Sequence, residues 1–126
     1  MESKEGNVKP LKVALIGAHG MLAADVIKSC PEGVELVGYD LPELDITRRE
    51  QVLDLAEKKF DVIINCAAYT DVDGCESNRE QARAVNANGP EYLAELAKHT
   101  GALLVHLSTD FVFNGQKKTP YLETDT

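Results

Sequence analysis

The first residues that could do chemistry are two glycines that directly follow the first apolar run of the chain. Gly17, Gly20 and Ala23 form the pattern GxxGxxA after the run that ends at Ile16. In such a turn the first glycine makes the bend, the second lets a pyrophosphate approach the next helix, and the small third residue keeps that helix close to the sheet. The pattern predicts a dinucleotide site lined by the turn residues Gly17, His19, Gly20, Met21 and Leu22. The alternative is an ordinary strand-to-helix turn, in which His19 is only an exposed loop histidine.

A carboxylate lies where the second strand is expected to end. Asp40 follows the glycine turn by about 20 residues, a place where a carboxylate accepts hydrogen bonds from both ribose hydroxyls and repels a 2′-phosphate. We therefore interpret Asp40 as a ribose-binding residue, which favours NAD(H). The alternative is that Asp40 is only a turn residue at the end of the strand. Arg48 and Arg49 keep NADP(H) open, because they could reach a 2′-phosphate. Asp45 and Ile46 could hydrogen-bond and pack against the adenine, although Asp45 could equally cap the next helix.

The elements that position these residues alternate along the chain. Apolar runs predict strands over 12–16, 34–39, 61–65 and 102–107, and periodic segments predict helices over 21–30, from the N-cap Thr47 to 59, and over 80–99 with a bend near Asn88-Gly89-Pro90. A short helix is expected from Asp73, which has Glu76 three residues on. This order predicts an α/β, Rossmann-like, doubly wound parallel sheet of about four strands in the order 3-2-1-4. Residues 1–10 are expected to be a disordered N-terminal extension, and residues 11–126 the N-terminal part of an NAD(P)-binding Rossmann domain.

Composition narrows the class of protein. The chain has 126 residues and a formal net charge of −8, which argues against nucleic acid or an anionic membrane as the main partner. Cys30, Cys66 and Cys75 are an odd number and form no CxxC pair, so we expect neither a disulfide framework nor a metal site. No apolar run reaches membrane-spanning length, and the expected compartment is the cytoplasm.

Three further stretches carry a family likeness: NCAAYT after the third expected strand, AVN within the long helix, and LSTDFVFNG followed by PYxE after the fourth strand. With the glycine turn, they resemble the extended short-chain dehydrogenase/reductases. Within these, they resemble the dTDP-4-dehydrorhamnose reductase family, whose members use NAD(H) or NADP(H) to reduce the 4-keto group of a nucleotide-linked deoxysugar in dTDP-L-rhamnose synthesis. The resemblance covers residues 11 to 126, and STDxVFxG is its most specific part.

The resemblance implies roles for individual residues. Cys66, Ala67 and Ala68 would form a small-residue wall against the cofactor, with Tyr69 along the nicotinamide. Asn86 would bend its helix near the catalytic centre and hold a water. Thr109 would be the catalytic hydroxyl that binds the substrate carbonyl, beside the lining residue Ser108 and the substrate-binding residues Asp110 and Phe111. Without the resemblance, these stretches could be an ordinary strand-to-loop crossing, an exposed helix position and a Ser-Thr-Asp turn.

One part of the family pattern is missing from these 126 residues. The family's proton donor is the Tyr of a Tyr-x-x-x-Lys motif, and none of Tyr39, Tyr69, Tyr92 and Tyr121 has Lys four residues later. We therefore expect a cofactor-binding fragment of the reductase that is inactive alone. The alternatives are a non-catalytic nucleotide-binding regulatory subunit of the same fold, or a fragment of a sugar-nucleotide epimerase or dehydratase. The fourth strand would leave an open apolar edge, through which a homo-oligomer could form.

Overall fold

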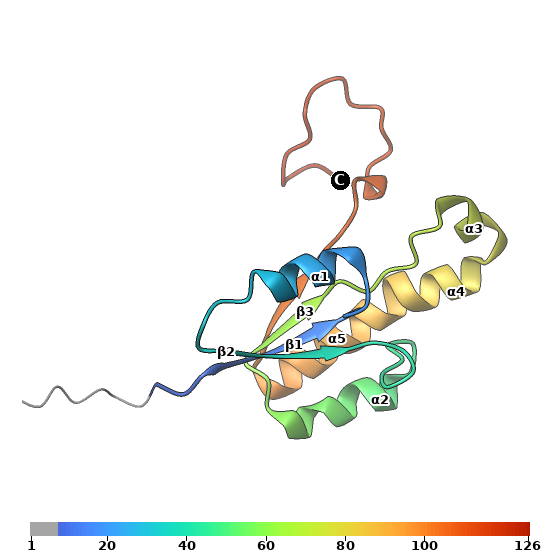
Figure 1. Ribbon diagram of the computed structural model, residues 1–126. Coiled ribbons are helices and arrows are strands. Elements are labelled where there is room, and N and C mark those ends of the chain that lie inside the picture. The colour runs from blue at the N-terminus through green and yellow to red at the C-terminus, as the bar shows by residue number, and fades with distance from the viewer. Residues whose placement is uncertain (1–7) are drawn as a thin grey trace, which may run out of the picture.

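The computed structural model describes residues 8–126, which form one four-stranded parallel sheet with helices on both faces (Figure 1). The strands are β1 (Leu11–Ile16), β2 (Val34–Tyr39), β3 (Val62–Asn65) and β4 (Leu103–His106). They alternate with helices, as the apolar runs predict, and the Rossmann-like α/β class is confirmed. Among the described helices, none combines the length and the apolar character needed to cross a membrane. Most of the expected disordered extension, residues 1–7, lies outside the described residues.

The strand order is β2-β1-β3-β4, so the expected order 3-2-1-4 is wrong. The third strand pairs with the free side of β1 instead of adding beyond β2. Asp61, just before β3, helps to fix this pairing, because its N–H donates to the Lys12 carbonyl and its carboxylate accepts from the Lys12 N–H, both at 2.8 Å. Exposed Glu35 makes β2 suitable as an edge strand, whereas the buried run of β1 suits the centre of the sheet.

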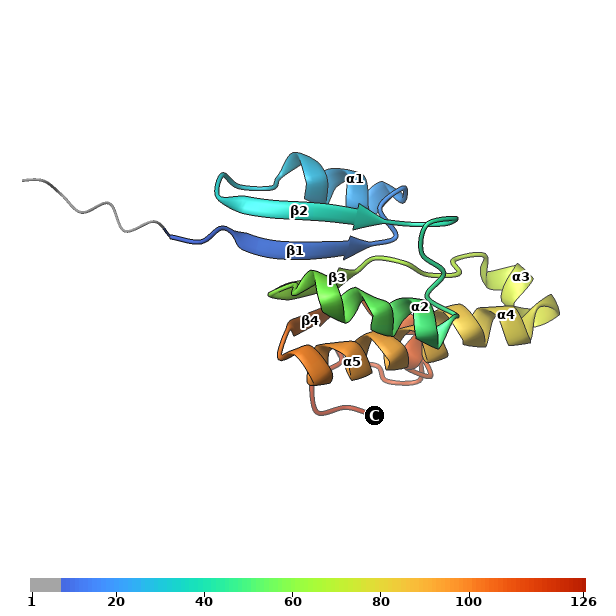
Figure 2. The ribbon, with the colours of Figure 1, turned by 90° about the horizontal axis from the view of Figure 1, so that it is seen from below.

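The strand order also decides which helix covers which face. Right-handed crossovers place a connecting helix on the opposite face when the chain reverses its direction across the sheet. The helix α1 (Met21–Lys28) therefore lies on one face, and α2 (Arg49–Asp54) and α5 (Gly89–Thr100) lie on the other (Figure 2). The reversal takes place between β1 and β3, and it is at such a point that open α/β sheets form a crevice for ligands.

The helices differ from the expected ones mainly at their ends. α1 ends at Lys28, and α2 starts at Arg49 and continues as a 3₁₀ turn (Leu55–Lys58). Thr47 is not the N-cap of α2, because its hydroxyl is bound 2.6 Å from Asp45 Oδ1 and Arg48 takes the cap position. The short helix α3 (Val72–Ser77) starts before Asp73, because Asp71 caps it by accepting a hydrogen bond from the Gly74 N–H.

The long helix expected over 80–99 is divided into α4 (Arg79–Arg83), a π-helical turn (Ala84–Asn88) and α5. The expected bend is therefore a widened turn that comes before Gly89-Pro90. Pro90 fits at the start of α5, since a proline in the first turn of a helix costs no hydrogen bond. α5 ends at Gly101, whose φ of +77° is a left-handed conformation that favours glycine.

The hydrophobic core lies between the sheet and the α2/α5 layer. It joins side chains from β1 and β3 to the inner faces of α2 and α5, and its members are Ala14, Ile16, Leu44, Ile46, Val52, Leu55, Phe60, Ile63, Leu93, Leu96 and Ala97. The opposite face is less completely covered over β4, where Leu103 is 62% and Val105 is 41% exposed. The core thus holds β1 and β3 rigidly at the point where their carboxyl ends meet.

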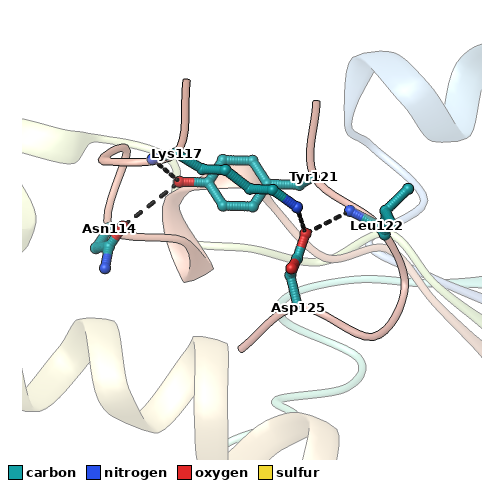
Figure 3. Close-up of polar contacts among 5 residues, drawn as sticks. All are labelled: Asn114, Lys117, Tyr121, Leu122 and Asp125. Atoms are coloured by element: carbon teal, nitrogen blue, oxygen red, sulfur yellow. Dashed lines mark hydrogen bonds and ion pairs between the residues drawn. The ribbon is translucent and has the colours of Figure 1, made fainter. Parts of the chain in front are cut away.

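The chain after β4 forms a loop that stretches away from the sheet on the α1 side (Figure 1). A short 3₁₀ turn (Asp110–Val112) begins it. Figure 3 shows how it closes on itself: the Tyr121 hydroxyl accepts from the Lys117 N–H at 3.3 Å, and the Asp125 carboxylate binds the Lys117 ammonium and the Leu122 N–H. The Tyr121 ring also stacks on Phe113, with 4.1 Å between the ring centroids.

Candidate functional site

The glycine turn lies at the carboxyl end of β1 and is held there by the end of β2. The N–H groups of Gly17 and Ala18 both donate to the Tyr39 carbonyl, at 2.9 and 3.1 Å. Gly17 has a φ of +79°, and the Gly20 N–H donates back to its carbonyl at 3.0 Å. This tight bend is what the first glycine of the pattern was predicted to make.

The wall that follows β3 passes directly beside this turn. A Cβ on Gly17 would lie 2.6 Å from the Ala67 nitrogen, a distance that no real Cβ contact allows. The Cys66 N–H donates to the Ile16 carbonyl at 2.9 Å, which ties the start of the wall to the end of β1. The start of the NCAAYT stretch therefore packs directly against the glycine turn.

Helix α1 begins at this turn without a capping side chain. Its N-cap is Gly20, and within residues 8–126 no side chain accepts a hydrogen bond from its first turn. Ala23 is completely buried, which allows the helix to lie close to the sheet. The free N–H groups and the positive end of the helix dipole together form a place for an anion. Met21 and Leu22 are 91% and 48% exposed, and neither residue lines the pocket described below.

Asp40 ends β2 beside the glycine turn, where its carboxylate is already oriented by the backbone. Its Oδ2 accepts from the His19 N–H and its Oδ1 from the Leu41 N–H, both at 2.8 Å. The His19 ring lies near the same carboxylate, with Nδ1 3.7 Å from Oδ2. The Asp40 side chain is 25% exposed and lines the adjoining pocket, and a carboxylate oxygen can accept more than one hydrogen bond.

The contacts of Asp45 support the second of the two roles considered for it, at the start of α2. Its Oδ1 accepts from the Thr47 N–H at 2.9 Å, and its own N–H donates to Gln51 Oε1 at 2.9 Å, so Asp45 does prepare the start of α2. Leu44 and Ile46 beside it are buried. Arg48 remains close, with Nε 3.8 Å from Asp45 Oδ2, whereas Arg49 is bound to Glu95 of α5. Only Arg48 of the two arginines is therefore placed near the pocket.

These segments enclose a pocket of about 340 Å³. Of the predicted cofactor residues, it is lined by Gly17, Gly20, Asp40, Asp45, Ile46, Cys66, Ala67, Ala68 and Tyr69. The pocket is also lined by residues that the sequence patterns did not predict for the cofactor: Ile16, Leu41, Leu44, Thr47, Gln81 and Val85. Leu44 and Thr47 flank the predicted residues Asp45 and Ile46 in the sequence. No sequence pattern in α4 predicted that Gln81 would line the pocket.

Asn86 does not line the pocket and acts on its wall instead. From the π-helical turn, its Oδ1 accepts from the Tyr69 N–H at 2.8 Å and its Nδ2 donates to the Tyr69 carbonyl at 3.0 Å. The side-chain amide of Asn86 thus binds both the N–H and the carbonyl of Tyr69. π-helical turns are often found where a side chain is placed for function, and here the placed side chain fixes Tyr69.

The residues after β4 lie apart from the pocket lining. Ser108, Thr109, Asp110 and Phe111 are exposed at the carboxyl end of β4, on the same edge of the sheet as the glycine turn. The Thr109 hydroxyl donates to Asp110 Oδ1 and accepts from the Phe111 N–H, both at 3.2 Å. Thr109 is thus presented on a turn, and its role toward a substrate stays a prediction.

Two features limit other chemistry at this pocket. Burial raises the pKa of the Cys66 thiol above its ordinary value of 9.0, so at neutral pH the group is a thiol and a poor nucleophile. Across the described part of the chain, no three His, Cys, Asp or Glu side chains are grouped so that they could hold a metal ion.

The chain thus has a Rossmann-like fold, with a pocket where its strand order reverses. Comparison with known families assigns the chain further. Residues 11–126 match the family model described as the RmlD substrate binding domain, and the chain belongs to this family.

Several known proteins of this kind are similar to the chain. The dTDP-4-dehydrorhamnose reductase of Mycobacterium tuberculosis is 40% identical over 122 residues, which are 90% of this chain and 39% of that protein. The crystal structure of the dTDP-4-dehydrorhamnose reductase of Clostridium acetobutylicum is 42% identical with a TM-score of 0.88, and the match covers 91% of this chain and 42% of that one. The dTDP-4-dehydrorhamnose reductase of Bacillus anthracis, solved in complex with NADP, is 36% identical with a TM-score of 0.84. This match covers 89% of this chain and 41% of that one. The chain thus spans about 40% of the length of these relatives, and the resemblance seen in its motifs is confirmed.

Proposed function

We propose that this chain binds NAD(H) or NADP(H) in the pocket that is lined by Gly17, Asp40 and Ala67. It would supply the cofactor side of a reductase that acts on the 4-keto group of a nucleotide-linked deoxysugar. The observation that carries the proposal is the approach of Ala67 to Gly17, beside an uncapped helix start. Residues 11–126 are then the N-terminal part of a dinucleotide-binding domain.

The residues fit such a cofactor at each of its ends. At the pyrophosphate end, Gly20 has no side chain to crowd the start of α1, where an added Cβ would lie only 3.3 Å from the Gly17 carbonyl oxygen. At the ribose, Asp40 offers acceptor positions on a carboxylate that two backbone N–H groups already hold in place. Leu41, Leu44 and Ile46 offer apolar surface to an adenine, as most nucleotide pockets do.

The chemistry at the other end involves the wall and the turn after β4. A bound reduced nicotinamide supplies a hydride. Cys66, Ala67 and Tyr69 would position its ring by their shape, and Thr109 would donate a hydrogen bond to the substrate carbonyl, lowering the cost of negative charge on that oxygen. Ser108, Asp110 and Phe111 would line the substrate side.

A proton must also reach the carbonyl oxygen, and these 126 residues contain no Tyr-x-x-x-Lys pair. We therefore expect this chain, tested by itself, to bind the cofactor without turnover. A direct assay is NADH or NADPH oxidation with a 4-keto sugar nucleotide. Rapid oxidation by this chain alone would contradict the proposal.

The choice of cofactor rests on Asp40 and Arg48. The carboxylate favours NAD(H), while Arg48 near the pocket and the NADP complex of the Bacillus anthracis relative favour NADP(H). Parallel titrations with NADH and NADPH, followed by nicotinamide fluorescence, separate the two. We expect Asp40→Ala to weaken the binding of NADH by about tenfold and the binding of NADPH by less, because only NADH offers both hydroxyls of the adenine ribose to the carboxylate. Equal affinities with no effect of Asp40→Ala would remove the ribose assignment.

Assembly and compartment are part of the same proposal. The exposed β4 edge, with Leu103 and Val105 on its open face, supports association with a second copy of the chain. Three free cysteines support a reducing compartment such as the cytoplasm. Sedimentation over a range of concentrations tests the association, and a monomer at all of them would remove it.

A further inference from the structure

One polar side chain is enclosed at the carboxyl end of β3, next to the pocket wall. Asn65 is 1% exposed and is the only polar residue that is buried within residues 8–126. A buried amide is costly unless its oxygen and its nitrogen both find partners. The partners of Asn65 therefore show what its side chain holds in place.

Its oxygen binds the wall and its nitrogen binds the neighbouring strand. Oδ1 accepts from the Ala67 N–H at 3.1 Å, and Nδ2 lies 3.2 Å from Nδ1 of His106, the residue opposite Asn65 in the β3–β4 register. The Ala67 N–H can only donate, so the amide oxygen must face it and Nδ2 must face His106. His106 Nδ1 is then an acceptor, and the ring carries its proton on Nε2.

We propose that Asn65 is a positioning residue for the cofactor pocket and that His106 holds it in its orientation. Ala67 is the residue that approaches Gly17, where a Cβ would already be 2.6 Å away. A displacement of the Ala67 peptide would therefore disturb its contact with the glycine turn, and both segments line the pocket. Asn65 fixes that peptide from inside the sheet, without touching the ligand space itself.

The same pair connects the wall to the strand that leads to Thr109. His106 ends β4, and the Leu107 N–H donates to the Asn65 carbonyl at 3.4 Å, so backbone and side chain of Asn65 both hold this end of β4. Ser108 and Thr109 follow directly. The pair thus sets the spacing between the cofactor wall and the proposed substrate side of the site.

The test compares Asn65→Ala with Asn65→Asp in the 126-residue chain. The aspartate keeps an acceptor for the Ala67 N–H and can pair with the His106 ring, whereas alanine removes the acceptor. In Asn65→Ala we expect amide hydrogen exchange at Ala67, followed by NMR, to become at least about tenfold faster and NADPH affinity to fall about tenfold. In Asn65→Asp both should stay within about threefold of the wild type.

His106 gives a second, exposed position for the same test, which does not depend on replacing a buried residue. His106→Ala should also accelerate amide exchange at Ala67, but less than Asn65→Ala does. His106→Gln again offers an acceptor to Asn65 Nδ2 and should restore the wild-type exchange rate. His99→Ala, an exposed histidine at the end of α5, is the matched control and should change neither readout.

Two results would overturn the inference. One is an unchanged Ala67 amide in both Asn65→Ala and His106→Ala. The other is a loss in Asn65→Asp as large as that in Asn65→Ala, because the aspartate keeps the acceptor for the Ala67 N–H on which the inference depends. The inference rests on the proposed function for its effect on NADPH, but the exchange of Ala67 is measured without cofactor. If the wild type fails to bind NADPH, the proposed function is wrong. The exchange rate of the Ala67 amide still tests the inference about Asn65 in that case.

Discussion

Gly17 and Ala67 lie so close together that the backbone of one occupies the space in which the other would need a side chain. An added Cβ on Gly17 would lie 2.6 Å from the Ala67 nitrogen and 2.8 Å from its Cα. Both neighbours are backbone atoms in a wall that is tied to β1 and to Asn65. Neither side can therefore move aside by rotating a side chain.

We expect Gly17→Ala to destabilise the protein by more than about 2 kcal/mol, because the contact adds to the strain of a left-handed alanine. Gly33→Ala is the matched control: Gly33 has a φ of +82° and nothing within 4 Å of its added Cβ. It should cost only the backbone strain, about 1–2 kcal/mol. Urea unfolding of both variants measures the difference. Equal losses would mean that the wall yields to the extra methyl group.

Gly89 is close to Ile46 in a similar way, but here the neighbour is a side chain. A Cβ on Gly89 would lie 2.6 Å from Ile46 Cδ1. We expect Gly89→Ala to cost about 1–3 kcal/mol in the wild type and clearly less in an Ile46→Val background, which lacks that methyl group. A double-mutant cycle in urea gives the coupling. Additive free energies would show that the two residues do not limit each other.

Asn86 should matter for ligand affinity through Tyr69. Asn86→Ala removes two hydrogen bonds to the Tyr69 backbone, and we expect NADPH binding to weaken by about tenfold. Asn86→Asp keeps the acceptor but places a negative oxygen against the Tyr69 carbonyl, so it should not rescue binding. Asn88→Ala, in the same π-helical turn, is the control variant. Wild-type affinity in Asn86→Ala would show that Tyr69 is held by its other contacts.

Cys66 reports on occupation of the pocket. Because burial raises the pKa of its thiol above 9.0, the reactive thiolate is scarce at neutral pH, and alkylation by iodoacetamide should become fast only at more alkaline pH. Saturating NADPH should slow it further, since Cys66 lines the pocket. Peptide mass spectrometry measures the rate at each cysteine. Rapid modification of Cys66 at pH 7 would contradict the raised pKa that its partial burial causes.

Asp125 should make the order of the last loop dependent on acid pH. The hydrogen bond from Lys117, and then that from the Leu122 N–H, lower the pKa of Asp125 below its ordinary value of 3.8 (Figure 3). The contribution of this carboxylate to loop stability is thus complete above pH 3.8 and is lost as the pH falls through the lowered value. Lys117→Met should return the pKa toward 3.8, which NMR titration of the Asp125 carboxyl measures. An unchanged titration would exclude Lys117 as the main cause.

Local patterns predicted the pocket better than the arrangement of strands. The turn at Gly17, the carboxylate at Asp40 and the small residues Cys66 to Ala68 each follow a strand, and the carboxyl ends of parallel strands share one edge of a sheet. The strand order failed because a four-residue apolar run pairs equally well on either side of its neighbour. The choice depended on long-range contacts between Asp61 and Lys12, which no local pattern contains.

The caps and the division of the long helix could not be read from the sequence for a similar reason. Thr47, Asp71 and Asp73 all have side chains that can cap a helix, and the backbone path decides which of them does. Gln81 became a pocket residue only because the segment between α4 and α5 is widened.

The π-helical turn has a consequence for how this family should be aligned. A π-turn accommodates one more residue than the α-turn it replaces, so it is equivalent to a single inserted residue within a helix. Deleting one residue from Ala84–Asn88 would restore a continuous α-helix and turn α4 by about 100° around its axis relative to α5. Gln81 would then leave the pocket, while Leu93 and Leu96 would stay in the core. A one-residue gap at this place in a relative therefore marks a changed cofactor wall, even where every motif of the sheet is intact.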